Sequence, residues 1–476
     1  MIGKKHKLDD SFELTGNWWL PDKPDKKVPG VLRYDAGSIV LELIGNLHDD
    51  QSTFGVIDSV GLQPPLINGQ CAGQFYCVYS CFLKTINTQF PSTDSTSKYG
   101  GRFLFAGVAF ESEEDMKFVK LEVSFDSLEH WIGQLVFSVP DLANEEEFSR
   151  KYRHPEQLSI RCDSIASTVA TDSRLETSGG YFEDKWTYTS SVIVAPDDDM
   201  DFHTACQRYA DLRNLLTLCV GNRVFTKYFT LHYFPSKKQG DTDIPYQADV
   251  LFSERSRRLE KPVGHWEMLF HYQTIKEQFP ALLNNWFSRS AELRTSYDLL
   301  FGTIYSDDLY VRLQFLNMIH AIENFDRHRN ASHYLSKEEY EPIRQLLTNS
   351  IPPSVSKDHR RSLASKIEFG HEYSLRKRLA GLYASLSSEC QQIVCRGDSS
   401  FPQKVADTRN YFSHYTKDLE AKAWTNPDQL FHATERLRFL LTILLLRDLG
   451  MEESLIANAI KNNVALQHFV NRVDVP

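Results

Sequence analysis

Short apolar runs dominate the first half of the chain. From Phe12 to about Phe252, alternating or continuous apolar segments are separated by turn residues, a pattern typical of β-strands. Strands are expected at Ser38–Leu43, Phe75–Leu83, Arg102–Phe110, Phe118–Phe125, Trp131–Val139, Trp186–Val194 and Tyr228–Phe234. One helix interrupts them, from Asp201 to about Val220, with Gly221 as its stop. The pattern predicts a β-rich half, built as a sandwich or a barrel-like sheet.

After Pro262 the apolar positions follow a helical period to the end of the chain. Helices are predicted at Asp307–Arg329, Ser336–Asn349, His359–Phe369, Ser374–Cys395, Pro402–Ala423, Pro427–Leu449 and Glu453–Asn462. Ser306 or Asp307 is available to cap the first of these. The predicted fold class is therefore α+β and multidomain. Residues 1–255 form a β-rich domain or two β-rich subdomains, 256–302 a helical connector, and 303–476 an all-α domain.

The composition is that of an ordinary soluble protein of 476 residues. The longest aliphatic run, Phe439–Leu446, is interrupted by Thr442 and is far shorter than the roughly 20 residues that span a bilayer. The N-terminus is basic, but no apolar segment follows it as in a secretory signal. We therefore expect a cytoplasmic protein that does not bind a membrane.

The eight cysteines are scattered and form no Cys-x-x-Cys pair. Cys77 and Cys81 lie on one face of a predicted strand, where two thiols can meet one metal ion. No Cys-His pair with suitable spacing accompanies them, so buried reduced thiols are the interpretation that we favour. The sequence predicts neither a metal nor another cofactor.

Charge is distributed unevenly along the chain. The net charge is −10, to which residues 1–299 contribute −11 (31 basic, 42 acidic) and residues 300–476 contribute +1 (22 basic, 21 acidic). Because phosphate binding requires cationic surface, any nucleic-acid contact should be local and C-terminal. The candidate cations are Arg376, Lys377, Arg378, Lys404 and Lys417. A charge run of this size is also common on a solvated helix face.

The C-terminal half contains the six residues Arg409-Asn410-Tyr411-Phe412-Ser413-His414 within a helical pattern. On a helical wheel, one line is apolar and predicts the core-facing stripe: Phe401, Val405, Thr408, Phe412, Tyr415 and Leu419. The opposite side is polar: Arg409, Asn410, Ser413, His414 and Lys417. The wheel therefore places Arg409 and His414 away from the core of their own helix.

An Arg followed by a His after four to six intervening residues is weak evidence by itself. With 28 arginines and 16 histidines, roughly three such spacings are expected by chance, and the chain has three. Arg258 to His265 spans Pro262 and Gly264, which break a helix. Arg327 to His333 ends in a predicted helix exit. Only Arg409 to His414 has helical periodicity on both sides.

The segment 401–415 resembles the HEPN domain of the ApeA-type anti-phage proteins, whose superfamily carries an Arg, often a polar residue, three more residues and a His. The beginning of the chain resembles the N-terminal domain of the same family in three stretches: Phe12–Pro21, Val28–Leu32 and Leu41–Gly45. The resemblance implies an all-α HEPN bundle for residues 303–476 and an N-terminal sensor or regulatory domain. It also implies that Arg409 and His414 are catalytic and that RNA is the substrate.

The residue types suit cleavage of RNA, which carries its own 2′-hydroxyl nucleophile. Arg409 can hold phosphoryl oxygens in a bidentate fork, and a histidine such as His414 can exchange a proton near neutrality. Asn410 lies between them on the wheel and can bind a phosphate or fix the imidazole. Tyr411 is assigned to packing or to contact with a base.

One histidine per chain supplies one general acid or base, whereas transesterification benefits from two. HEPN ribonucleases place two motifs against each other across a dimer interface, so the resemblance implies a homodimer or a larger even-numbered homo-oligomer. It also implies that the N-terminal half binds a phage-derived trigger.

Glu323 forms a second candidate group with its neighbours on the preceding helix. On a wheel starting at Leu309, the stripe that begins with Leu313 and Leu316 continues as His320, Glu323 and Arg327. A local pair of Glu323 with His320 or Arg327 is the favoured interpretation. The alternative is that Glu323 faces the motif helix and orients Arg409 or His414, since a carboxylate in a core stripe needs a partner.

Two hypotheses follow for the whole chain. The first is an antiviral, metal-independent endoribonuclease that cleaves cellular RNA during phage infection. The second is a non-catalytic HEPN module for dimerisation or binding, coupled to a β-rich sensor domain. A carbohydrate-binding role for the first half would rest on aromatics such as Trp18 and Trp19, which we expect in the core.

Overall fold

The protein is described here from a computed structural model. The structure describes residues 5–47, 64–88, 95–138, 150–235, 244–253, 261–330, 332–415 and 417–471. The chain divides into two compact units, Met1–Ser288 and Arg289–Pro476. The segment expected to connect the domains, 256–302, is shared between the two units.

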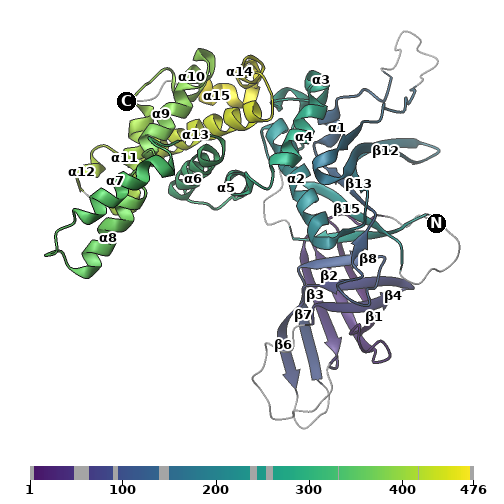
Figure 1. Ribbon diagram of the computed structural model, residues 1–476. Helices are drawn as coiled ribbons and strands as arrows, with labels where there is room; N and C mark the ends of the chain where they lie inside the picture. Colours follow the sequence, from purple (N-terminus) through teal and green to yellow (C-terminus); the bar gives the residue numbers. More distant parts are fainter. Residues whose placement is uncertain are drawn as a thin grey trace. The chain divides into compact units, whose positions relative to one another are not determined.

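The first unit is built on one antiparallel sheet (Figure 1). Its strands are β1 (Ser11–Trp19), β2 (Val28–Asp35), β3 (Ser38–Ile44), β4 (Leu66–Cys71), β5 (Gln74–Tyr79), β6 (Phe82–Thr88), β7 (Ser95–Gly100), β8 (Phe103–Ala106), β10 (Lys120–Phe125), β11 (Ser159–Cys162), β12 (Ser167–Gly180), β13 (Glu183–Pro196), β15 (Thr226–Tyr233) and β16 (Tyr246–Phe252). Their order is β11-β12-β13-β10-β15-β16-β8-β5-β4-β1-β2-β3-β7-β6. Two short strands, β9 (Lys117–Phe118) and β14 (Met200–Asp201), pair separately. The expected β-rich half is confirmed.

Alternation along the strands creates the core of this unit. In β2 and β3, the side chains of Leu32 and Leu41 are buried while their neighbours along each strand are more exposed, as the two-residue period requires. Trp18 is completely buried and packs against the backbone of Gly69, where an added Cβ would lie 2.3 Å from the indole ring. Trp18 and Trp19 are both core residues, so they offer no exposed aromatic platform for a sugar.

Helices cover part of the sheet, and one of them replaces a predicted strand. Helix α2 (Phe202–Val220) is confirmed within one residue, with Asp201 as its N-cap and Gly221 in the left-handed conformation at its end. The strand expected at Trp131–Val139 is not formed over residues 131–138: α1 (Leu128–Ile132) takes the first two of them, and Phe137 makes an isolated bridge with Tyr152. Val139 lies outside the described residues. The buried residues of α1, Leu128, Trp131 and Ile132, follow helical spacing. Two further helices, α3 (Tyr272–Ile275) and α4 (Phe279–Arg289), follow β16.

The strand expected at Phe75–Leu83 is interrupted. Ser80 adopts a left-handed conformation between β5 and β6, so Cys77 and Cys81 do not share a continuous strand. Both thiols are buried and reduced. Burial raises the pKa of Cys81 to about 12, which keeps the sulfur protonated.

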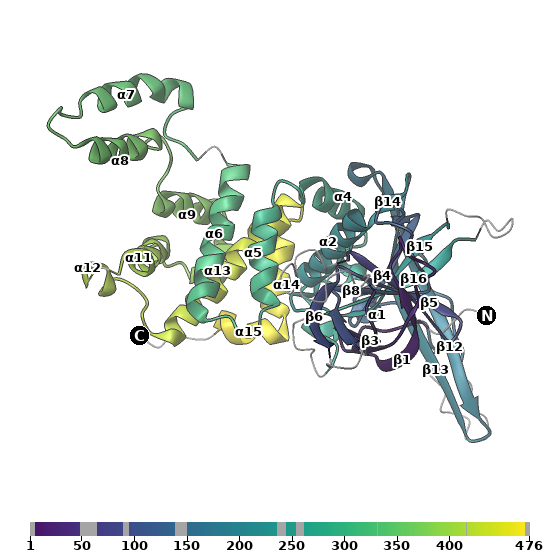
Figure 2. The same ribbon diagram turned by 90° about the horizontal axis from the view of Figure 1, so that it is seen from below.

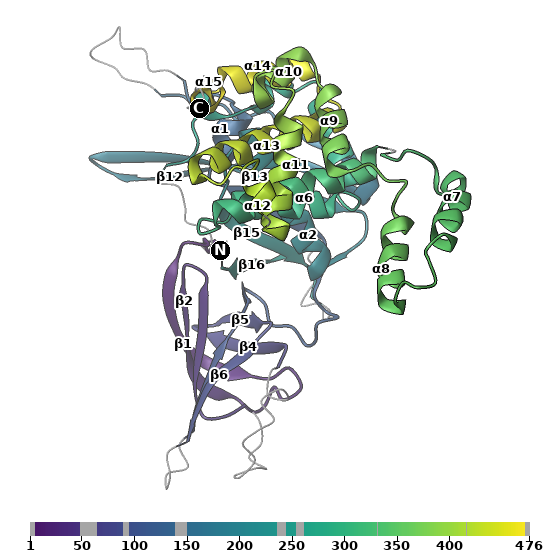
Figure 3. The ribbon, with the colours of Figure 1, turned by 90° about the vertical axis from the view of Figure 1, so that its left-hand side faces the viewer.

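The second unit is helical, as expected, and α13 lies at its centre (Figure 2). Its helices are α5 (Arg294–Ile304), α6 (Val311–Arg329), α7 (Lys337–Asn349), α8 (Lys357–Glu368), α9 (Leu375–Ala384), α10 (Ser388–Cys395), α11 (Phe401–His414), α12 (Lys417–Glu420), α13 (Pro427–Asp448), α14 (Glu453–Asn462) and α15 (Val464–Asn471). Helix α13 packs on α6, α10 and α14, and its apolar residues are almost all buried. Figures 2 and 3 show α7 and α8 standing away from the other helices of this unit as a hairpin.

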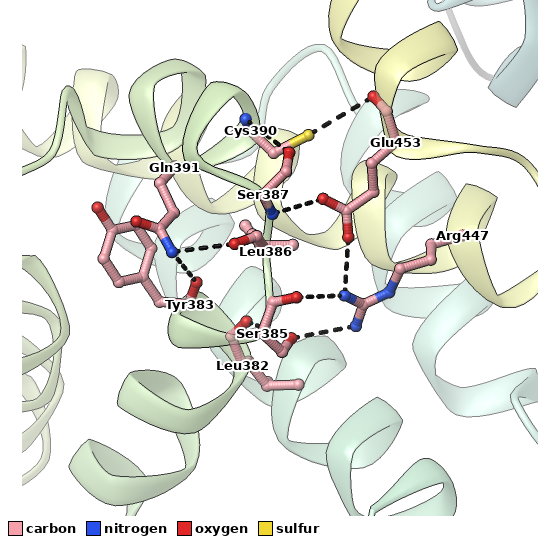
Figure 4. A network of polar contacts seen from close by, with 9 residues as sticks. All are labelled: Leu382, Tyr383, Ser385, Leu386, Ser387, Cys390, Gln391, Arg447 and Glu453. Carbon is pink, nitrogen blue, oxygen red and sulfur yellow. Dashed lines mark hydrogen bonds and ion pairs between the residues drawn. The ribbon is translucent and has the colours of Figure 1, made fainter.

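The helix expected at Ser374–Cys395 is two helices separated by a turn (Figure 4). Arg447 donates to the carbonyl of Ser385 at 2.9 Å, and Glu453 accepts from the amide of Ser387 at 2.6 Å. Arg447 and Glu453 also pair with each other at 2.9 Å. The side chain of Ser387 caps α10, so the break is fixed from both sides. Of the described helices, none is long and apolar enough to cross a bilayer.

Candidate functional site

Helix α11 carries the motif and buries one face, largely as the wheel predicts. Phe401, Val405, Thr408 and Phe412 are buried. On the other side Arg409, Asn410 and Tyr411 are half-buried, while Ser413 and His414 are exposed. Helix α9 packs beside α11 (Figure 3).

The helix ends nine residues earlier than the expected Ala423, at His414. Tyr415 adopts a left-handed conformation, and the chain then turns back, so that the amide of Trp424 donates to the Thr408 hydroxyl at 3.1 Å. In a continuous helix these two residues would lie about 24 Å apart. The predicted core position of Tyr415 is therefore wrong: its side chain is 57 % exposed.

The reversal places His414 at the last helical position, with its side chain in solvent. No described residue makes a hydrogen bond or an ion pair with its imidazole. One turn earlier, Nη1 of Arg409 donates to Oδ1 of Asn410 at 3.2 Å. Among the described residues no carboxylate pairs with Arg409, so the guanidinium keeps most of its donors for a ligand. Asn410 thus contacts Arg409 and not the imidazole.

Arg312, at the start of α6, contacts the C-terminal end of the motif helix. Its guanidinium lies over the ring of Phe412 at 4.7 Å and donates to the hydroxyl of Tyr415 at 2.9 Å. This arginine adds an exposed cation beside the turn that follows His414. Sequence reasoning missed Arg312, because the contact joins residues 103 positions apart and no local pattern announces it.

The prediction for Glu323 rests on a stripe that is not the core face of α6. The buried face consists of Phe315, Met318, Ile319, Ala321, Ile322, Phe325 and Asp326. Leu313 is 45 % exposed, and Glu323 is half-buried without a hydrogen bond or ion pair to any described residue. Arg327 pairs with Glu372 at 2.7 Å instead. Neither the expected local pair nor a contact of Glu323 with Arg409 or His414 is formed.

The buried carboxylate of α6 is Asp326, and its partner is Arg378 of α9. Arg378 donates to Asp326 at 2.9 Å, to Glu372 at 3.0 Å and to the carbonyl of Tyr373 at 3.0 Å. The side chains of Arg378 and Asp326 are each only 3 % exposed. Arg378 was expected among the RNA-contacting cations, but these contacts occupy its guanidinium inside the protein. It therefore links α9 to α6.

The other candidate cations are exposed. Lys404 extends from α11 over the ring of Trp424 at 5.6 Å. Lys377 of α9 lies over Tyr334 at 4.2 Å and over Tyr373 at 4.4 Å. Arg376 and Lys417 are also exposed. Because α9 packs beside α11, Arg376 and Lys377 belong to a helix next to the motif.

Comparison with protein families identifies both halves of the chain. A family model described as ApeA N-terminal domain 1 matches residues 13–286, which is more than half of the chain. A model described as Apea-like HEPN matches residues 316–455, from within α6 to the start of α14, and this segment includes Arg409 and His414. No curated protein and no solved structure matches the chain.

Proposed function

This chain belongs to the ApeA family, with an Apea-like HEPN domain in its second half, and we propose that it is an anti-phage endoribonuclease that cleaves cellular RNA. The observation that carries the proposal is the exposed end of α11. There Arg409, held by Asn410, and the exposed imidazole of His414 lie on a helix that the HEPN match includes.

The proposed chemistry needs only these side chains and the RNA. Arg409 binds the oxygens of the scissile phosphate and stabilises the charge that develops on them. His414 removes the proton of the 2′-hydroxyl or donates one to the leaving oxygen, and each such role typically contributes about 10²- to 10⁴-fold. The bond from phosphorus to the 5′-oxygen breaks as the 2′-oxygen attacks, and the leaving 5′-oxygen takes up a proton, which gives a 2′,3′-cyclic phosphate and a 5′-hydroxyl. The proposed step uses no metal ion or other cofactor.

A single His414 cannot act as both base and acid at the same moment. We therefore propose a homodimer, or a larger even-numbered assembly, in which two copies of α11 meet at a twofold axis and two histidines share one RNA strand. The exposure of Ser413 and His414 is consistent with this arrangement, because a buried motif could not meet a second copy.

The strand would be positioned by cations around the motif. Lys404 on α11, Lys417 on α12, and Arg376 and Lys377 on α9 are the proposed phosphate contacts, with Tyr411 as a surface for a base. The β-rich half, with its net negative charge, is proposed to recognise a phage-derived trigger rather than the RNA backbone. The proposed place of action is the cytoplasm, where host RNA is available.

The deciding experiment compares the purified full chain with its Arg409→Ala and His414→Ala variants on total RNA in EDTA. We expect cleavage by the wild type and a loss of at least about 100-fold in each variant, with the oligomeric state unchanged. His320→Ala is the matched control, because His320 is an exposed histidine on α6 whose replacement should leave RNA cleavage unchanged.

Equal cleavage by all four proteins would refute the assignment of the site. Absence of cleavage by the wild type, combined with loss of dimers in Arg409→Ala and His414→Ala, would favour the non-catalytic dimerisation module instead. Full activity in a strictly monomeric preparation would refute the shared site.

A further inference from the structure

The base of the α7–α8 hairpin brings two histidines and a glutamate together. The segment after α6 and the segment before α9 meet in an antiparallel bridge between His333 and Glu372. The amide of Tyr334 donates to the carbonyl of His371 at 2.7 Å, and a second backbone hydrogen bond of 3.0 Å closes the other side. This pairing fixes the backbone segments that carry the three side chains.

The three side chains are close enough to share one ion. His333, His371 and Glu372 each offer one ligand atom, and these atoms all lie within 4.8 Å of one another. The two imidazole rings are nearly parallel, 11° apart in plane and 5.3 Å apart in centre. Tetrahedral zinc with bonds of about 2.0–2.2 Å separates its ligand atoms by roughly 3.3–3.6 Å. The exposed side chain of His333 can rotate to close the remaining gap.

Two of the three side chains have a polar atom that receives no hydrogen bond from the described residues. Nδ1 of His371 is buried without a hydrogen-bond partner, which ordinarily costs about 1–3 kcal/mol. Oε2 of Glu372 accepts a hydrogen bond from Arg378 at 3.0 Å and forms an ion pair with Arg327 at 2.7 Å, and no described residue donates to Oε1. A carboxylate held by hydrogen bonds on one oxygen while the other binds metal is the usual outer-shell arrangement of a metal site.

We propose that His333, His371 and Glu372 bind one divalent transition-metal ion of the zinc class. This ion would hold together the two chain segments that pair at the base of the α7–α8 hairpin. Two imidazoles favour Zn²⁺ over the oxygen-seeking Mg²⁺ and Ca²⁺. Arg327 and Arg378 neutralise Glu372 and so strengthen this preference, because a hard cation would depend on the carboxylate charge. The proposal departs from the expectation, drawn from the cysteines, that the chain binds no metal.

The test is zinc binding to the full-length protein after treatment with EDTA and removal of the chelator. Isothermal titration should show a site with a stoichiometry of one for Zn²⁺ and no heat for Mg²⁺. His333→Ala should weaken this binding by at least about tenfold. His359→Ala is the matched control, because His359 is exposed on α8 in the same hairpin. Equal affinity in the wild type and in His333→Ala would overturn the site.

A second readout tests whether the bound ion stabilises the base of the hairpin, and it does not depend on RNA cleavage. Hydrogen exchange at the amides of Tyr334 and Tyr373, which close the bridge, should slow when Zn²⁺ is added to the wild type. It should stay unchanged in His333→Ala. Zinc binding without slower exchange at these amides would refute the proposed stabilisation of the hairpin base. Since His333 is exposed, its replacement should leave the fold intact, which circular dichroism verifies.

Discussion

Arg378→Met should destabilise the helical unit strongly, because it leaves a buried carboxylate without its main partner. The Arg378 side chain is 3 % exposed and makes three hydrogen bonds, including one of 2.9 Å to Asp326. Removing one member of a buried ion pair costs about 3–5 kcal/mol. Asp326 retains a hydrogen bond of 2.9 Å from the side-chain amide of Asn330, so we expect the lower part of this range.

Arg327→Met is the matched control for this perturbation. Arg327 contacts the same oxygen of Glu372 at 2.7 Å, but its side chain is 51 % exposed. A pair of this kind contributes about 0–1 kcal/mol, because water screens the charges. Both variants remove one arginine from the same carboxylate. Arg378→Met also removes the buried contacts with Asp326 and the Tyr373 carbonyl, whereas Arg327→Met removes an exposed pair.

The assay is thermal unfolding of the full chain, followed by helix-sensitive circular dichroism. A loss of 1 kcal/mol lowers the melting temperature of a domain of this size by roughly 2–4 °C, so Arg378→Met should lower it by about 6 °C or more. Arg327→Met should lower it by at most about 4 °C. Equal shifts in the two variants would show that the buried contacts of Arg378 contribute no more stability than the exposed pair of Arg327.

Three further predictions concern the same unit. Phe315→Ala should lower the free energy of unfolding by about 3–5 kcal/mol, because Phe315 is fully buried and its ring centre lies 6.2 Å from that of Phe412. Chemical denaturation should show no comparable loss for Leu313→Ala, because Leu313 is 45 % exposed. Lys404→Ala should reduce the dependence of RNA affinity on salt by a slope of about 0.7, measured by anisotropy titrations at several salt concentrations. Burial alone would raise the pKa of Glu453, but hydrogen bonds from the turn and from Arg447 lower it overall. A carboxylate with a lowered pKa stabilises the fold at pH values above its ordinary pKa of 4.5. The difference in free energy of unfolding between the wild type and Glu453→Gln should therefore shrink as the pH falls below 4.5.

The first turns of the motif helix could be predicted because the pattern that specifies them lies within the segment itself. Phe401, Val405 and Phe412 repeat at helical spacing, and all three are buried. The end of the helix could not be predicted in this way. It depends on the packing of Trp424 against Thr408, which lies 16 residues earlier in the chain. A wheel extended past His414 therefore misplaced Tyr415.

The environment of the motif shows the same limit. The buried carboxylate of α6 is Asp326 rather than Glu323, although the apolar spacing of Phe315, Ile319 and Ile322 already marked the true core face. The wheel began at Leu309, outside the helix, and followed the wrong stripe. Arg312 gave no local signal at all, since it meets the motif helix only through tertiary packing.

The proposed site is built by two chains, and mixing wild-type with variant subunits tests this sharing. Wild-type and His414→Ala chains are co-assembled in varying ratios, and RNA cleavage is measured in EDTA. If cleavage needs both histidines of a dimer, activity follows the square of the wild-type fraction, so an equal mixture retains about one quarter. A linear decline, with about one half retained in the equal mixture, would show that each chain acts alone and would rule out the shared site.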